Sequence, residues 1–72
     1  KSFNVTAYKI DNNLLELQKG PCIYIITQGH GLIENRNYKR ILSKGDYFFM
    51  PYNANKTTIS TDSSLEFVRC SD

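Results

Sequence analysis

The chain has 72 residues and a formal net charge of +2, and its nine Lys and Arg residues are scattered rather than clustered. This length allows one domain at most, so we treat residues 1–72 as a single unit. A mild and dispersed positive charge argues against nucleic-acid binding, which needs a concentrated basic face. No apolar run approaches the roughly 20 residues of a membrane span, so we expect a soluble domain with no nucleic-acid or membrane partner.

The chain begins at Lys1, with neither a charged leader nor an apolar segment behind it. We therefore expect either a processed product or, in preference, a piece of a longer protein, and a cytoplasmic location. The two cysteines, Cys22 and Cys70, lack the spacing of a metal site. Isolated thiols of this kind are more often small buried apolar residues than ligands or disulfide partners, so free thiols are the expectation.

Strand patterns begin at the amino end. Residues 3–8 alternate apolar and polar side chains, which is the period of a half-buried strand. Residues 11–13 (Asp-Asn-Asn) predict a turn, and residues 14–18 resume as a short strand. After the turn at Gly20-Pro21, residues 22–27 are almost entirely β-branched or aromatic. That composition predicts a strand covered on both of its faces.

The second half of the chain repeats this alternation of strands and turns. Turns are predicted at residues 28–31, 35–37, 43–45 and 61–64. Strands are predicted at residues 32–34, 38–42, 47–50, 56–60 and 65–69. Gly45 can take the positive φ of the turn that starts the strand at Tyr47, and Pro51 ends that strand's hydrogen-bond ladder.

No helical period persists anywhere in the chain. About eight short strands with frequent turns predict an all-β fold, a small antiparallel jelly-roll barrel. Closure into a barrel would also remove exposed sheet edges.

Two stretches resemble the motifs of the cupin family. Gly45, five residues and then Pro51 match the second cupin motif, and residues 22–31 resemble the end of the first, where a strand meets a glycine turn. Together with Gly20-Pro21 and residues 65–69, they look like the carboxy-terminal jelly-roll domain of class I mannose-6-phosphate isomerases. The resemblance implies a zinc-dependent parent that interconverts mannose 6-phosphate and fructose 6-phosphate, with its zinc and catalytic groups in the preceding domain.

The positions of the cupin metal ligands are substituted here. The ligand Glu falls on Cys22, the two His positions of the first motif fall near Glu16 and Gln18, and the last His falls on Lys56. An ammonium group has no lone pair to donate, so Lys56 is a poor ligand. We therefore expect no metal, cofactor or catalytic site within these residues.

Isolated polar residues favour structural roles over chemical ones. His30 lacks a partner within sequence reach and predicts a solvated turn histidine, while Asp46 predicts a carboxylate that accepts backbone N–H groups in its turn. Glu16 and Glu66 predict outward positions rather than a carboxylate pair, and Cys22 an inert buried thiol. The aromatic side chains near Pro51 predict core filling in so small a barrel; they are Tyr47, Phe48, Phe49 and Tyr52.

The leading hypothesis is a non-catalytic barrel that stabilises the preceding catalytic domain of an isomerase, which is its expected partner. It predicts an apolar patch on one face of the fragment. The alternative is a sugar-sensing cupin domain of a transcription regulator, with a carbohydrate stacked on Tyr24, Tyr47 and Phe49. A free-standing metal cupin enzyme is the third reading, disfavoured by the substituted ligand positions.

Overall fold

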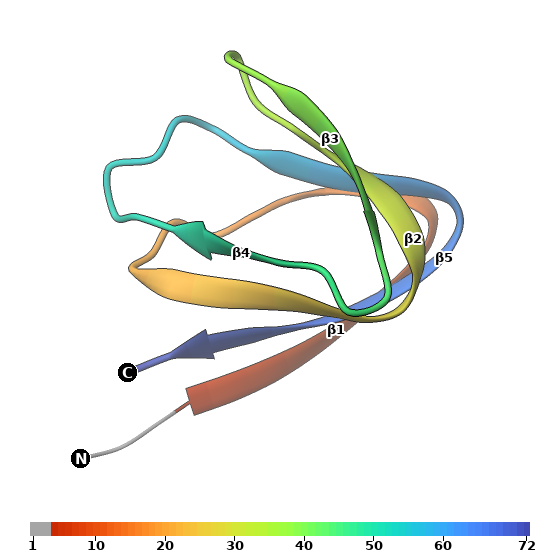
Figure 1. Ribbon diagram of the computed structural model, residues 1–72, viewed down its shortest axis with the longest axis horizontal. Helices are drawn as coiled ribbons and strands as arrows, with labels where there is room; N and C mark the ends of the chain where they lie inside the picture. Colours follow the sequence, from red (N-terminus) through yellow and green to blue (C-terminus); the bar gives the residue numbers. More distant parts are fainter. Residues whose placement is uncertain (1–3) are drawn as a thin grey trace.

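The computed structural model of the protein describes residues 4–72, a range that contains strands, turns and loops but no helix (Figure 1). The strands are β1 (Asn4–Glu16), β2 (Cys22–Glu34), β3 (Lys39–Ser43), β4 (Tyr47–Met50) and β5 (Thr58–Ser71). Neighbouring strands are all antiparallel, in the order β1-β5-β2-β3, and β4 also pairs with β2. The predicted all-β, antiparallel fold is confirmed. No helix in the described range could cross a membrane.

Three of the five strands are long and bend in the middle, which explains why there are not eight. The ladder between β1 and β5 shifts register at Asp11 and Asn13, where Asn12 has a φ of 45°. The ladder between β2 and β5 shifts around Gly29, whose φ is 80°. The predicted turns at 11–13, 28–31 and 61–64 are therefore bends within β1, β2 and β5. The strand predicted over 3–8 runs from Asn4, and Phe3 lies outside the described residues.

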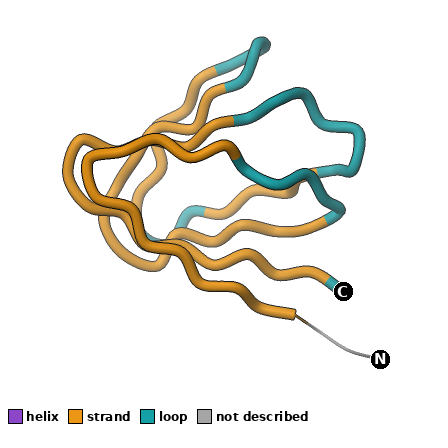
Figure 2. Tube along the Cα trace, turned by 180° about the vertical axis from the view of Figure 1, so that it is seen from behind, coloured by secondary structure: helices purple, strands orange, loops and turns teal. Residues whose placement is uncertain are grey.

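The bends divide the sheet into two half-sheets that face each other. The first half-sheet consists of residues 4–11 of β1, 64–71 of β5, 22–28 of β2, and β4. The second consists of residues 13–16 of β1, 58–61 of β5, 29–34 of β2, and β3. Figure 2 shows the strands wrapping around a common interior, with most of the loops at one end. No ladder among residues 4–72 joins β1 to β3 or β4, so the barrel stays open along that side and the predicted closure is incomplete.

The core lies between the two half-sheets. Its largest fully buried side chains come from both halves: Tyr24, Ile26, Ile33, Leu42, Ile59, Leu65 and Phe67. Tyr24 stacks on Phe48 with ring centroids 5.2 Å apart, and Phe67 stacks on Tyr8 at 5.0 Å. Because these rings come from β1, β2, β4 and β5, they tie the whole first half-sheet together.

The turn before β4 forms as predicted. Gly45 has a φ of 95°, and its backbone N–H donates to the carbonyl of Ile26 over 2.9 Å. The carboxylate of Asp46 accepts the backbone N–H of Ser43 at 2.9 Å, which confirms its structural role. The turn thereby holds β4 against the edge of β2.

The prediction that the aromatic side chains near Pro51 fill the core holds for Phe48 and is wrong for Tyr47, Phe49 and Tyr52. Phe48 and Met50 face inward, whereas Tyr47 and Phe49 are 67% and 61% exposed. Tyr52, in the following loop, is also exposed. Successive side chains of a strand point to opposite faces, so β4 can bury only alternate residues, and Tyr47 and Phe49 face outward.

Candidate functional site

The residues at the cupin metal positions do not form a metal site. Cys22 points into the core, whereas Glu16, Gln18 and Lys56 are exposed on β1 and in two loops. No group of three or more His, Cys, Asp or Glu within residues 4–72 is arranged to hold a metal ion. The donor chemistry does not fit either, because neither an ammonium group nor a primary amide is a strong ligand for zinc.

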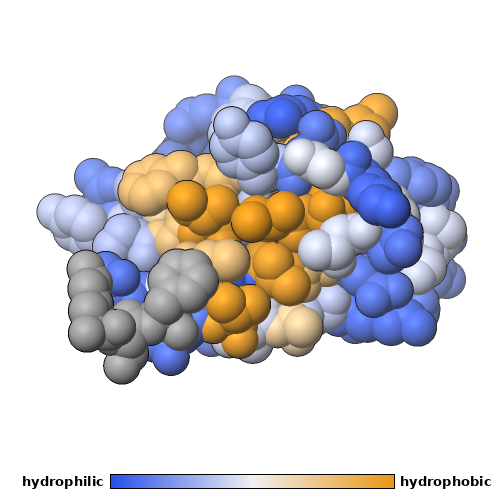
Figure 3. Space-filling view, turned by 60° about the horizontal axis from the view of Figure 1, so that its bottom comes forward, coloured by the Kyte–Doolittle hydropathy of each residue, from blue (hydrophilic) through white to orange (hydrophobic). Residues whose placement is uncertain are grey.

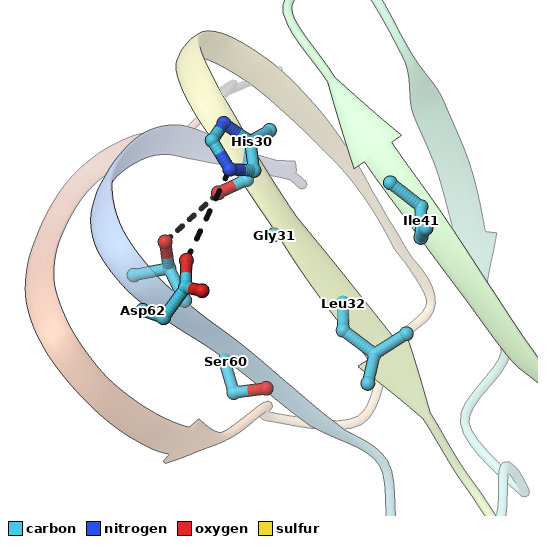
Figure 4. Close-up of a pocket in the computed structure, with 7 residues that line it drawn as sticks. His30, Gly31, Leu32, Ile41, Ser60 and Asp62 are labelled. Carbon is cyan, nitrogen blue, oxygen red and sulfur yellow. Dashed lines mark hydrogen bonds and ion pairs between the residues drawn. The ribbon is translucent and has the colours of Figure 1, made fainter.

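His30 lies on β2 at the bend rather than in a turn between strands. Its Nε2 atom is 4.0 Å from Oδ1 of Asp62, and both side chains are exposed. Figure 4 shows the pair beside Leu32, Ile41 and Ser60, which border a hollow on the outside of the second half-sheet. An exposed contact of this kind between oppositely charged groups contributes little stability. The expectation of a solvated histidine holds, although the predicted turn does not.

Glu16 and Glu66 do not form a carboxylate pair. Glu16 lies opposite Thr58 in the second half-sheet, while Glu66 lies opposite Lys9 in the first. The bends in β1 and β5 separate the two positions, and both side chains face outward. Their predicted outward orientation is confirmed.

A polar cluster within the first half-sheet was not predicted. The hydroxyl of Tyr24 donates to the carbonyl of Gln18 over 2.9 Å. Nη1 of Arg69 donates to Oγ of Ser71 at 3.3 Å, and its Nη2 donates to the carbonyl of Lys19 at 3.4 Å. Burial raises the pKa of Tyr24 to about 12, in opposition to the nearby charge of Arg69.

This cluster attaches the segment between β1 and β2 to the core. The sequence contains a signal for it, because Arg69 follows Leu65 and Phe67 at the same period of two and so falls on the inward side of β5. Because Arg69 was grouped only with the scattered basic residues, the inward position of its side chain was not predicted. Nη1 and Nη2 of Arg69 reach a hydroxyl and a backbone oxygen, whereas its buried Nε has no hydrogen-bond partner among the described residues, so the two Nη contacts make the cluster an anchor for the segment.

The outward side of the first half-sheet is unusually apolar, and we call it the apolar face. One row across the four strands is Val5, Cys70, Ile23 and Phe49, and the next is Ala7, Val68, Ile25 and Tyr47. Figure 3 shows apolar side chains gathered on this side of the molecule. The row beyond them is polar and consists of Lys9, Glu66 and Gln28. The prediction that residues 22–27 are covered on both faces is met on the inner face alone.

Cys22 and Cys70 lie on opposite sides of the first half-sheet. Cys22 is buried in the interior, whereas Cys70 is half-buried within the apolar face. Both are free thiols. A disulfide between them would require one side chain to pass through the sheet, because side chains on opposite faces point apart.

No family model and no curated protein matches the chain. Its structure is similar to that of the EutQ protein of Clostridium difficile, with a TM-score of 0.76 and 16% identity over 94% of this chain and 54% of that one. For a putative ethanolamine utilization protein Q from Salmonella typhimurium LT2, the TM-score is 0.77 and the sequence identity 18%. The match covers 97% of this chain and 57% of that one. For a cupin-2 domain containing protein from Shewanella frigidimarina NCIMB 400, the TM-score is 0.75 and the sequence identity 13%. The match covers 94% of this chain and 68% of that one.

These similarities support a cupin-2 type of fold for this chain. The chain spans a little over half the length of the two ethanolamine utilization proteins. At identities below one fifth, the similarity concerns the fold and not the chemistry.

Proposed function

We propose that this chain is a non-catalytic cupin domain that packs through its apolar face against the catalytic domain of the same protein, a mannose-6-phosphate isomerase. The observation that carries the proposal is the apolar face itself. Zinc and the catalytic groups would then belong to the partner domain, and the barrel would contribute stability rather than chemistry.

The size of the apolar face fits a domain contact. Val5, Ile23, Tyr47 and Phe49 are between 40% and 67% exposed, although they are adjacent across hydrogen-bonded strands. Tyr47 and Phe49 alone offer on the order of 250 Å² of accessible surface. A standard interface buries about 800 Å² on each partner, so two side chains supply roughly a third of one. Contiguous apolar surface of this kind usually marks an interaction site.

The interior supports a structural role rather than a catalytic one. The side chains that form the core between the half-sheets are apolar, and the Tyr24 hydroxyl beside them donates to a backbone carbonyl. The hollow between Tyr8 and Tyr24 measures about 90 Å³. Small-molecule sites usually measure about 300–1,000 Å³, so this hollow is too small to hold a sugar phosphate.

The alternative, a sugar-sensing domain of a transcription regulator, has less support. The aromatic residues named as examples for its sugar pocket are Tyr24, Tyr47 and Phe49. Tyr24 is 1% exposed and faces the interior, whereas Tyr47 and Phe49 face outward from the other side of the same half-sheet. The three rings therefore cannot contact a single ligand.

Fragment complementation tests the proposal. We expect the 72-residue chain to bind a class I mannose-6-phosphate isomerase that has been truncated before its carboxy-terminal barrel, and to raise its thermal stability. The double variant Ile23→Thr/Val68→Thr keeps β-branched residues on the strands and removes apolar surface, so we expect it to bind at least tenfold more weakly.

The matched control is Leu14→Thr/Ile41→Thr, which makes the same change on the outside of the second half-sheet. We expect this control to bind like the parent chain. Absence of binding by the parent chain, or equal loss in both double variants, would refute the proposal.

A further inference from the structure

A hollow of about 360 Å³ lies at the loop end of the barrel, between the β2–β3 hairpin and residues 51–57. All the side chains that line it are uncharged, in a chain of which 22% is charged. Asn35, Asn53 and Asn55 supply amides, and Tyr38 and Phe48 supply aromatic rings. The hollow borders one end of the core, because Met50 and Phe48 line it, and none of the four substituted metal positions is among its lining residues.

Several hydrogen bonds and one ring contact hold this lining in place. Oδ1 of Asn35 accepts the backbone N–H groups of Asn37 at 2.8 Å and Tyr38 at 3.2 Å, which leaves its NH₂ group to donate elsewhere. The hydroxyl of Thr57 donates to the carbonyl of Asn55 over 2.8 Å. Phe48 is fixed by its stacking on Tyr24. The hollow is therefore largely pre-formed, as ligand sites usually are.

The lining selects one chemical class of ligand. A charged ligand would lose its hydration without gaining a counter-charge, because none of the lining residues is ionised at neutral pH. A wholly apolar ligand would leave amide groups buried without partners, which is also unfavourable. Amides both donate and accept, as hydroxyl groups do, and an aromatic ring can pack against the C–H face of a saturated ring.

We propose that this hollow binds a neutral, polyhydroxylated ring, either a free monosaccharide or cyclitol or the terminal sugar of a glycan. The volume lies at the lower end of the range for small-molecule sites and suits one ring. The hollow shares Phe49 with the apolar face, but its amides belong to other residues, so sugar binding by the free chain and docking of the apolar face are tested separately. Of the three aromatic residues given as examples for the sugar-sensing alternative, Phe49 lines this hollow and Tyr24 and Tyr47 do not.

Amide-detected NMR titration of the 72-residue chain tests this site, using mannose, glucose and myo-inositol as probes. We expect millimolar affinity, with shifts confined to residues 35–38 and 48–57 and to the side-chain amides of Asn53 and Asn55. The variant Asn53→Ala/Asn55→Ala removes two amides, and we expect it to weaken binding about three- to tenfold. The control is Asn37→Ala, an exposed asparagine of the same hairpin that does not line the hollow, and we expect it to leave affinity unchanged.

Two further probes sharpen the result. Glucose 6-phosphate should bind more weakly than glucose, because the phosphate finds no cation in the lining. The methyl glycoside of a bound sugar distinguishes the sources: retained affinity identifies the terminal sugar of a glycan, and lost affinity identifies a free sugar. Absence of shifts with all three neutral probes, or equal binding by the Asn53→Ala/Asn55→Ala variant, would overturn the proposal.

Discussion

The outward sides of the two half-sheets differ although the same three long strands build both. The apolar face of the first half-sheet consists of two adjacent rows without a charged side chain. The outward side of the second has one row that is mostly apolar, Leu14, Ser60, Leu32 and Ile41. The next row is Glu16, Thr58, Glu34 and Lys39. The second side is patterned for water, while the first is patterned like a surface that lies against protein.

This difference is what we would expect if a partner covered the apolar face, as proposed above. A one-sided sheet normally alternates apolar and polar side chains along each strand. In β2 the second half-sheet follows that pattern at Ile33 and Glu34, but the first has Ile23 and Ile25 outward between Cys22, Tyr24 and Ile26 inward. Such a strand has the composition of one that is covered on both sides.

The largest expected difference is in the free energy of unfolding, between variants in the interior and variants on the outward sides of the two half-sheets. Ile59→Ala and Ile26→Ala should each lower the free energy of unfolding by about 2–5 kcal/mol, because both side chains are fully buried and leave cavities. Ile41→Ala and Ile23→Ala, on the outward sides of the same two half-sheets, should lower it by less, about 0.5 kcal/mol at the 74% exposed Ile41. Urea denaturation of the four variants measures the difference. Equal losses for Ile59→Ala and Ile41→Ala, or for Ile26→Ala and Ile23→Ala, would contradict the faces assigned to these side chains.

A smaller effect concerns pH and compares two tyrosines on opposite sides of the first half-sheet. The pKa of Tyr24 is about 12 in the folded chain against an ordinary value of 10.0. As pH rises, the unfolded chain therefore loses this proton first, and the stabilisation present below pH 10 is lost between about pH 10 and 12. Tyr24→Phe should flatten that part of the stability curve.

Tyr47→Phe is the control for this experiment, because Tyr47 lies on the apolar face and is 67% exposed. We expect this variant to retain the decline between pH 10 and 12. Denaturation midpoints across this range give the comparison. The role assigned to Tyr24 fails if its variant keeps the same slope as the parent chain.

The smallest effect belongs to the charged row of the second half-sheet. Nζ of Lys39 lies 3.9 Å from Oε2 of Glu34, and both side chains are well exposed. Lys39→Ala should change the free energy of unfolding by no more than about 0.5 kcal/mol, and less at high salt. A loss as large as that of a core variant would show that this row is not simply solvated.

Local signals in the sequence predicted the strands and the turn before β4. Gly45, Asp46 and Pro51 have specific backbone roles, and the structure places Gly45 and Asp46 in those roles. Asn12 and Gly29 lie at bends within strands, where the sequence predicts turns between strands. A positive φ suits both a turn and a bend, and only the pairing with a distant strand decides which of the two forms.

The surfaces were harder to predict, because each is assembled from segments far apart in the chain. The apolar face needs the register of four strands before Val5, Cys70, Ile23 and Phe49 form a row. The hollow at the loop end of the barrel likewise combines Asn35, in the β2–β3 hairpin, with a loop that begins after Met50. The both-sided apolar composition of residues 22–27 was the one local sign of the apolar face.

The central claim is that the apolar face is covered in the intact protein, and the two free cysteines offer a direct measurement. Cys70 lies within the apolar face, whereas Cys22 is 3% exposed in the core and serves as an internal reference. We expect iodoacetamide to modify Cys70 in the isolated chain and to modify it at least tenfold more slowly once the catalytic domain is bound, with Cys22 unreactive in both. Equal modification of Cys70 in the free chain and in the complex would contradict the claim.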